Sequence, residues 1–532
     1  MSTRRPPIRR GLRARARGVA MLMVITAITI LALVLIQFSS QTRTHLLAGV
    51  NVRDELAAIT LADTAIMLTR ACLDPAGLLG GAEGGALAAI GAQQLSKTNP
   101  EKLCNLILNL FVASRLDLPI GGLSLEVEGI EGLGLRGAEV EELRLTSEDS
   151  FLALNGLRCP PGPQGEPGLN CPGQTLVVGV LRAMLCDRRL DAVFDVEQQD
   201  GRKYTRGEVI ANLIDWIDAD DQRTRVDEDL NWQIGPDPGD SEDGYFRARA
   251  NRIETKNAPL DSIEELRLLP GVNSELFEFL RTRVSVYAKG QINANAVSEE
   301  LLADLLWAKD PLNPLSKNGC EGLRSESLNL DDRDDPDQQG GLNRTMYRMV
   351  AKLFVRARQV RESRALLSEA FKDKNQFLQI ARDPAAYICQ NDPGLSPGAI
   401  IGAPPDPTAV EICKIRVVGQ MLPEGVQWPN LDPYTQLMAQ VNATLTQLSP
   451  DLTFQSSLLR LEVRTKAGNL TKRVFAVLRR GGQTTRPGQP QPVNPVPPVN
   501  PANPASPGAA NPLGNPLDPT QNAVRVMYYR EY

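Results

Sequence analysis

The sequence predicts an α+β fold, in which a long N-terminal helix packs on an antiparallel sheet and a large all-α domain is inserted into the sheet domain. An uncharged, apolar run of twenty residues follows a basic N-terminus, which predicts one long helix. Apolar residues at helical spacing dominate residues 172–400. Alternating, β-like runs occur both before and after that stretch, so the helical region interrupts a sheet domain.

Length and composition exclude several classes of protein. The chain has 532 residues, 42% apolar and 23% charged, which is ordinary for a folded body of about two to four domains. It is neither wholly disordered nor a membrane protein with many spans. The single histidine, His45, argues against most histidine-based hydrolases and zinc enzymes. No phosphate loop or nucleophile–base motif occurs, so we expect no enzyme. The net charge of −5 does not favour nucleic acid as a partner.

The N-terminal segment predicts a membrane anchor. Residues 1–18 contain seven arginines and no acidic residue, and residues 19–38 form the uncharged run. As a helix, about twenty residues span roughly 30 Å, the thickness of a bilayer core. The arginines should stay in the cytoplasm, which places the rest of the chain beyond a single membrane pass. A plain signal anchor is the simpler alternative. A cleaved signal peptide fits less well, because the run is long and no clear small-x-small cut site follows it.

The junction between leader and helix has a more specific pattern. The basic segment ends in Gly18, and the apolar run continues into an amphipathic helical pattern through residue 68. This order resembles the type IV pilin-like signal, which implies that a prepilin peptidase cuts between Gly18 and Val19. Pilin-like subunits usually carry a glutamate at the fifth mature position, where this chain has Met23. An unpaired carboxylate in a bilayer is costly. Met23 therefore suits a subunit at the tip of a pilus-like filament, where no further subunit lies above it.

The rest of the chain divides by composition and spacing. Residues 484–520 hold 12 of the 39 prolines and predict a structureless linker. We expect seven parts: a basic leader (1–18), a transmembrane and amphipathic helix (19–70), the first part of a pilin-like α+β domain with insertions (71–171), an inserted α-helical domain (172–400), closing strands (401–482), a Pro-rich linker (483–521) and a terminal strand (522–532). The closing strands include a β-like run at 415–418 and a hairpin turn at 467–469.

An acidic loop after a predicted helix is the candidate metal site. Carboxylates at Asp218, Asp220 and Asp221 can converge on one ion if Glu242 and Asp243 come close to them. Calcium takes six to eight hard oxygen ligands, often from a flexible loop. The EF-hand spacing is absent, and a solvated run of charge is the alternative. A second acidic loop at 331–337 is less specific.

Two further motifs resemble nucleotide-binding or nucleic-acid-binding motifs. The sequence GLGLRG at 132–137 matches a dinucleotide fingerprint, but a short alternating segment follows it where a long helix is needed. The sequence at 257–272 looks like a helix-hairpin-helix, which can bind DNA phosphates. Its acidic surroundings and the lack of a basic patch argue against DNA.

Eight cysteines and no CxxC motif predict disulfides outside the cytoplasm. Proximity in sequence makes Cys159–Cys171 and Cys389–Cys413 plausible pairs, although the full pairing stays open. The first pair would close a loop with three collagen-like triplets, which are too few for a triple helix.

Several segments, in order, resemble one family. They are RGVAMLMVITAITIL at the leader junction, SFLALNGL, GEVIANLIDWIDADD followed by SEDGYF, NAPLDSIEELRLLPGV, INANAV, and the closing runs SSLLRLEVRTKAGNLTKRVFAVLRR and VRVMYYREY. This combination is similar to general secretion pathway protein K, the large minor pseudopilins of type II secretion systems. Absence of the glutamate at the fifth position is usual in that family, so Met23 agrees with the resemblance.

The resemblance implies a function and partners. It implies a place at the tip of the pseudopilus, in complex with I-type and J-type minor pseudopilins, where the protein caps the filament and helps to initiate its assembly for export of folded proteins across the outer membrane. It implies prepilin processing with methylation, a bacterial inner-membrane anchor, and a C-terminal domain in the periplasm. It also implies one or two calcium ions, with ligands matched by motif to Asp218, Asp220, Asp221, Glu242 and Asp243. Two other classes stay open: a membrane-anchored extracytoplasmic binding protein, and a helix-hairpin-helix DNA-uptake component.

Overall fold

The structure of the chain is a computed structural model, and its described residues fall into separate ranges. These ranges are 12–73, 101–102, 104–105, 108, 115–120, 123–128, 138–160, 168–198, 200–227, 232–248, 252–310, 320, 344–364, 369–392, 394–395, 407–422, 428, 430–480 and 525–531. The GLGLRG motif, the second acidic loop and the Pro-rich linker lie outside them.

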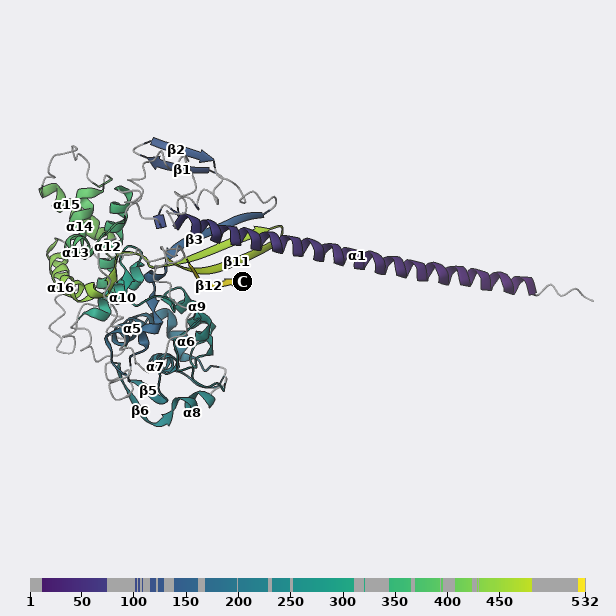
Figure 1. Cartoon of the computed structure of the whole chain (residues 1–532), viewed down its shortest axis with the longest axis horizontal. Coiled ribbons are helices and arrows are strands. Elements are labelled where there is room, and N and C mark those ends of the chain that lie inside the picture. The colour runs from purple at the N-terminus through teal and green to yellow at the C-terminus, as the bar shows by residue number, and fades with distance from the viewer. Residues whose placement is uncertain are drawn as a thin grey trace, which may run out of the picture.

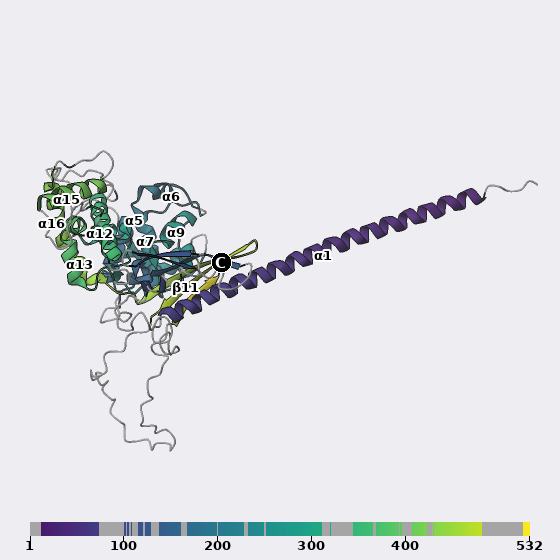
Figure 2. The same cartoon turned by 90° about the horizontal axis from the view of Figure 1, so that it is seen from above.

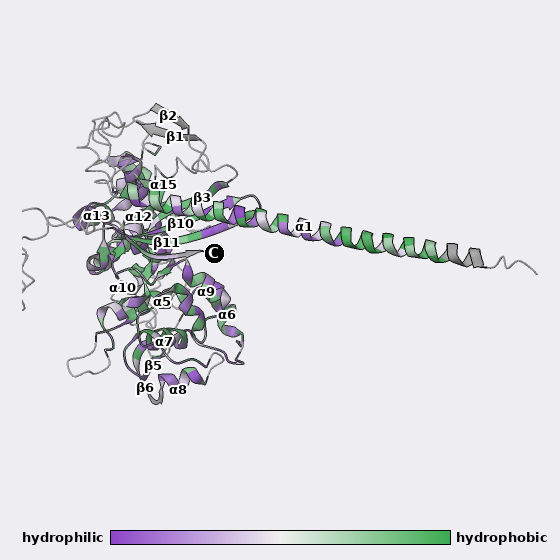
Figure 3. Cartoon of the chain, turned by 45° about the vertical axis from the view of Figure 1, so that its right-hand side comes forward, coloured by the Kyte–Doolittle hydropathy of each residue, from purple (hydrophilic) through white to green (hydrophobic). Residues whose placement is uncertain are grey.

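The N-terminal helix α1 (Leu12–Leu73) is continuous over 62 residues. It extends far from the rest of the molecule (Figure 1), and its outer half, which contains the uncharged run at 19–38, is mostly hydrophobic (Figure 3). Within the part of the chain that the structure describes, α1 is the helix long and apolar enough to cross a membrane. Its other end carries a buried stripe at helical spacing, of which Ala58, Leu61, Ala62 and Ala65 are 0% exposed. The predicted long helix, half of it packed on a domain, is confirmed.

The stripe packs on an antiparallel sheet of strand order β12-β11-β10-β3. The strands are β3 (Ala138–Ser147), β10 (Leu458–Ala467), β11 (Leu470–Arg479) and β12 (Arg525–Glu531). β10 and β11 form the predicted hairpin, in which Gly468 has a φ of +58°. The core between helix and sheet includes Leu143, Leu145, Leu461, Val463, Ala476 and Leu478. The helical region lies between β3 and β10 in the chain, which confirms that it interrupts the sheet.

The inserted region is a helical body beside the sheet (Figure 1). Its helices are α5 (Pro172–Leu185), α6 (Asp191–Asp195), α7 (Arg206–Ile217), α8 (Glu242–Arg247), α9 (Ser274–Arg281), α10 (Glu299–Lys309), α12 (Arg344–Arg364), α13 (Lys374–Ala381), α14 (Pro384–Asn391), α15 (Pro407–Met421) and α16 (Asp432–Leu448). The short strand pairs are β1 (Arg115–Ile120) with β2 (Leu123–Glu128), β4 (Leu152–Ala153) with β7 (Val284–Ser285), β5 (Gln222–Asp227) with β6 (Gln233–Ser241), and β8 (Ile292–Asn293) with β9 (Leu452–Thr453).

The prediction of closing strands from residue 401 is wrong for residues 407–448, which form α15 and α16. The β-branched run at 415–418 lies inside α15, where Val417 and Val418 are 1% and 2% exposed against the helical core. A short apolar run of this kind does not distinguish a strand from a helix, so tertiary packing determined that this segment is helical. The main sheet resumes at β10. The predicted terminal strand is confirmed by β12, which pairs with β11.

A buried ion pair joins the sheet to the helical body. Glu148 precedes β4, and its carboxylate accepts hydrogen bonds of 2.7 Å and 2.8 Å from the guanidinium of Arg460 in β10. Ser285 of the helical body donates to the same carboxylate. Glu148 is 0% exposed and Arg460 is 8% exposed. The neighbouring Asp149 accepts from the backbone N–H of Ser457 at 2.9 Å, so both acidic residues fix this junction.

All eight cysteines form disulfides. Cys159–Cys171 and Cys389–Cys413 confirm the two pairs that sequence proximity suggested. Cys72–Cys104 ties the end of α1 to a segment 32 residues away, and Cys186–Cys320 joins residues 134 apart. Pairs separated by so many residues cannot be predicted from proximity in the sequence.

Candidate metal centre

The centre begins at the end of α7. Thr205 and Glu208 form a reciprocal capping box at the start of this helix, and ten of its twelve residues are buried in the helical body. The helix ends at Ile217, so Asp215 lies in its last turn and Asp218 directly follows it. The two residues are three apart and therefore share a face of the chain.

The third carboxylate comes from α8, after the β5–β6 hairpin. The Ser241 hydroxyl caps this helix by accepting from the backbone N–H of Gly244 at 3.1 Å. Glu242 is therefore the first helical residue, and its backbone N–H donates to the carbonyl of Asp221 at 3.3 Å. This bond holds the start of α8 against the loop that follows α7.

Asp215, Asp218 and Glu242 each place a carboxylate oxygen within 4.8 Å of the others. Their exposed fractions are 0%, 4% and 0%. Both carboxylate oxygens of Glu242 and Oδ1 of Asp218 are buried without a hydrogen-bond partner. Burying a carboxylate without a partner is costly, so the group either keeps a proton or faces a cation.

The electrostatics point the same way. Burial, and then the charge of Asp218, raise the pKa of Glu242 to about 9. Burial, and then the charge of Asp220, raise the pKa of Asp218 to about 7. A divalent cation between these two side chains would remove both penalties, because it supplies the missing positive charge.

Asp215 differs from the other two, because its charge is already compensated. Its carboxylate forms a buried ion pair with Arg223 and accepts from the backbone N–H of Thr224 at 2.9 Å. Arg223 also donates to Oδ1 of Asn212 at 2.8 Å. The uncompensated negative charge of the centre therefore belongs to Asp218 and Glu242.

The structure brings together two of the five predicted ligands, Asp218 and Glu242. It places the other three outside this group. Oδ1 of Asp220 accepts from the backbone N–H of Gln222 at 2.9 Å, and Asp221 is exposed. The Asp243 carboxylate accepts from the backbone N–H and the hydroxyl of Thr255, both at 3.1 Å.

Asp215 is the member of the group that the predicted set omits. The signal for it was present in the sequence, because Asp215 and Asp218 stand one helical turn apart at the end of an apolar helix. The donors are carboxylates without cysteine or histidine, a set that suits calcium or magnesium and not zinc.

The predicted processing site lies in α1. Gly18 and Val19 are both helical, and Met23 is 64% exposed in the apolar outer part. The side chain of Thr26 donates to the Met23 carbonyl at 2.9 Å, which keeps the hydroxyl hydrogen-bonded within the helix. Residues 19–38 carry no charged side chain, and this hydroxyl is satisfied within the helix.

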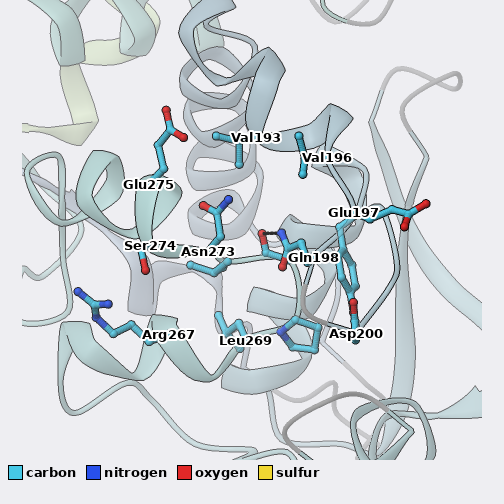
Figure 4. Close-up of a pocket in the computed structure, with 14 residues that line it drawn as sticks. Val193, Val196, Glu197, Gln198, Asp200, Arg267, Leu269, Asn273, Ser274 and Glu275 are labelled. Carbon is cyan, nitrogen blue, oxygen red and sulfur yellow. Dashed lines mark hydrogen bonds between the residues drawn. The ribbon is translucent and has the colours of Figure 1, made fainter.

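A hollow of about 490 Å³ lies beside the predicted helix-hairpin-helix turn (Figure 4). Gly271, with a φ of +88°, makes the turn, and its carbonyl accepts from Gln198 at 3.0 Å. Three carboxylates line the hollow: Glu197, Asp200 and Glu275.

One arginine, Arg267, also lines the hollow. It pairs with Glu278 at 3.3 Å, and its guanidinium lies 3.7 Å from the ring centroid of Phe277. The residues that line the hollow carry a net negative charge, which opposes binding of nucleic-acid phosphates.

The part of the chain that contains the metal centre is similar to a known family. Residues 196–289, which include all three carboxylates of the centre, match a family model described as type II secretion system (T2SS), protein K. No curated protein matches the chain in sequence. A crystal structure of the GspK-GspI-GspJ complex from the type 2 secretion system of enterotoxigenic Escherichia coli aligns with a TM-score of 0.35 and 14% identity, over 84% of this chain and 95% of that one. At this level of similarity, neither the fold nor the partners of the present chain follow from that structure.

Proposed function

We propose that this chain belongs to the type II secretion protein K family and is a minor pseudopilin that caps the tip of the pseudopilus and helps to initiate its assembly. The observation that carries the proposal is α1. One continuous helix has an uncharged, exposed run at 19–38 and, further along, a buried stripe under an antiparallel sheet. A subunit built in this way is stored in the inner membrane through the outer part of its helix, with the body in the periplasm.

The face of α1 opposite its buried stripe supports packing against partner helices. Val52, Leu56 and Met67 lie on that face by helical spacing and are 65%, 65% and 69% exposed. These exposed apolar side chains, of which Leu56 and Met67 flank Asp63, are available to pack against partner helices. The I-type and J-type minor pseudopilins are the partners that we propose for it.

The shape of the body supports a position at the tip. The helical body is much broader than α1 and lies at one end of it (Figure 2). A further subunit stacked above would have to occupy the space that the body fills. Met23 agrees with this position, because a subunit with no neighbour above it has no amine there to compensate a glutamate.

The N-terminal mass of the membrane-extracted protein tests the proposal. Coexpression with a prepilin peptidase should give a chain that begins at Val19 with a methylated amine. A chain that still begins near Met1 would instead favour a plain membrane-anchored binding protein. The peptidase-inactive strain is the control, since it should leave Gly18 and the leader in place.

We further propose that the metal centre binds one or two calcium ions. Asp218 and Glu242 would hold the first ion, with Asp215 beside them. Asp220, Asp221 and Asp243 would supply oxygens only after local rearrangement of their loops. The ion would neutralise two buried carboxylates and link the end of α7 to the start of α8, which is a structural role.

Thermal unfolding in calcium and in EDTA tests the calcium proposal. Calcium at about one hundred times its Kd should stabilise the chain by roughly 2.7 kcal/mol. Glu242→Gln should abolish this shift and raise the Tm in EDTA, because the variant no longer buries an unpaired carboxylate. Glu254→Gln is the matched control, since it removes the charge of an exposed carboxylate in the same region that is not among the proposed ligands. Equal calcium shifts in the wild type and Glu242→Gln would refute the assignment.

A further inference from the structure

The last strand, β12, is connected to the sheet in an unusual way. It is the outer strand and pairs antiparallel with β11, with a register shift between Val477 and Leu478. Adjacent antiparallel strands are usually joined by two to five residues. Here residues 480–524 separate them, and that segment is rich in proline. No tight turn therefore fixes β12 to its neighbour.

Two adjacent tyrosines anchor β12 on opposite faces of the sheet. The Tyr528 ring lies 5.2 Å from the ring of Tyr287 in the helical body and 5.9 Å from the ring of Phe475 in β11, measured between centroids. The Tyr529 hydroxyl lies on the other face, where it donates to Asp63 of α1 at 3.3 Å. One strand thus contacts the sheet, the helical body and α1.

The core does not depend on β12. In the described residues, the buried cluster between α1 and the sheet draws its members from α1, residues 104 and 108, β3, β10 and β11. Val526 and Met527 are 38% and 54% exposed, whereas Leu461 in β10 and Ala476 in β11 are 0% exposed. The three inner strands and their helix bury their apolar face without the outer strand.

We propose that the edge of β11, together with Tyr287, Phe475 and Asp63, is a strand-binding site that the chain fills with its own residues 525–531. Its ligand is an extended peptide that pairs with the β11 backbone and places adjacent tyrosines on the two faces. Backbone pairing supplies affinity in such strand addition, and the side-chain sockets supply specificity. An open β11 edge would otherwise invite pairing with other chains.

The long connection allows the strand to leave the β11 edge and return to it, and it also keeps the strand close to that edge. The proline-rich sequence predicts a linker here, and a random-coil chain of roughly 45 residues has a root-mean-square end-to-end distance of about 35–40 Å. A tether of this kind gives its strand an effective concentration on the order of millimolar. At micromolar protein, the chain's own strand therefore outcompetes that of a second copy, but it can leave and return.

A cleavable version of the full chain tests the proposal. A protease site is inserted within 483–521, the detergent-solubilised protein is cut, and a fluorescent peptide of residues 522–532 is added. Anisotropy should report at least tenfold tighter binding to the cut chain than to the uncut chain, because cutting abolishes the tethered competition. Native mass spectrometry should show the cut strand being replaced by the peptide.

Two variant peptides test the anchoring. The Tyr528→Ala peptide should bind at least tenfold more weakly, because it loses the ring contacts to Tyr287 and Phe475. The Met527→Ser peptide is the matched control and should bind within twofold of the original, since Met527 is 54% exposed. A cut strand that never exchanges, a cut chain that does not bind the peptide, or full binding by the Tyr528→Ala peptide would each overturn the proposal. None of these outcomes depends on processing at Gly18.

Discussion

At the scale of single residues, two buried ionic groups in this chain have opposite environments. Glu148 accepts from Arg460 and Ser285, so its charge is fully paired at the junction between sheet and body. Glu242 has no hydrogen-bond partner for either carboxylate oxygen. The first group is complete without a ligand. The second requires a proton or a cation. Glu242 therefore indicates a cation-binding site, whereas Glu148 stabilises the contact between the sheet and the helical body.

Breaking the Glu148–Arg460 pair should be strongly destabilising. Glu148→Gln leaves a buried guanidinium without its counter-charge, and removing one partner of a buried pair typically costs about 3–5 kcal/mol. Urea unfolding measures this as a lower midpoint at unchanged slope. As a control, Glu278→Gln removes half-exposed pairs with Arg267 and Arg281, and it should cost less than about 1 kcal/mol. A Glu148→Gln protein as stable as that control would show that the pair does not hold the junction.

At the scale of elements, the β10–β11 hairpin shows how a turn fixes a helix. Gly468 has a φ of +58°, which residues with a side chain rarely adopt. A Cβ at this position would lie 2.3 Å from Oδ2 of Asp54, a largely buried residue of α1. Lys472 of β11 pairs with Glu55 at 2.7 Å nearby. The turn is therefore both a strand connection and a contact surface for α1.

Gly468→Ala should destabilise the protein by about 1–3 kcal/mol, since it combines an unfavourable backbone conformation with a close approach to Asp54. Gly419→Ala should have the opposite sign. Gly419 lies in α15, where an added Cβ would meet no atom within 4 Å, so alanine should gain about 0.5–1 kcal/mol of helix propensity. Thermal unfolding of both variants measures the difference. Equal effects would mean that α1 does not rest on the hairpin turn.

At the scale of the whole molecule, distant segments place carboxylates together where the sheet meets the helical body. Burial raises the pKa of Glu101, and burial followed by the charge of Glu101 raises the pKa of Glu369 to about 7. Lys102 pairs with Glu362 at 3.1 Å, and Arg480 also contributes positive charge here. Because the folded state holds protons on these groups more tightly than the unfolded chain does, it is favoured at low pH.

The stability of the chain should therefore fall as the pH rises from about 5 to 8, through the raised pKa of Glu369. Glu369→Gln should flatten this dependence, since the amide carries no charge at any of these pH values. Denaturant unfolding in saturating calcium suppresses the similar contribution of Asp218 and Glu242, and the difference between the wild type and Glu369→Gln then reports the contribution of Glu369. A pH profile that is the same in the wild type and in Glu369→Gln would exclude this carboxylate as a source of the dependence.

The sequence by itself determined the features that depend on neighbouring residues. The uncharged run predicted α1, helical spacing predicted the helical region at 172–400, and the Ala467–Gly468 turn predicted the β10–β11 hairpin. The disulfides over 12 and 24 residues were predicted by proximity. Each of these is encoded by a local period or a short loop, and a single stretch of sequence contains the whole signal.

Only the tertiary structure decided the rest. The run at 415–418 became part of α15 because Val417 and Val418 pack on the helical core, with Cys413 bonded to Cys389 of α14. The acidic loop was visible in the sequence, but the convergence of Asp215, Asp218 and Glu242 required α8 to pack against the end of α7. Disulfides over 32 and 134 residues, and the pairing of β12 with β11, likewise depend on segments meeting in space. Local sequence sets the propensity of each element. Burial and charge compensation between distant elements then select which ones meet, because their energies exist only once the elements are packed.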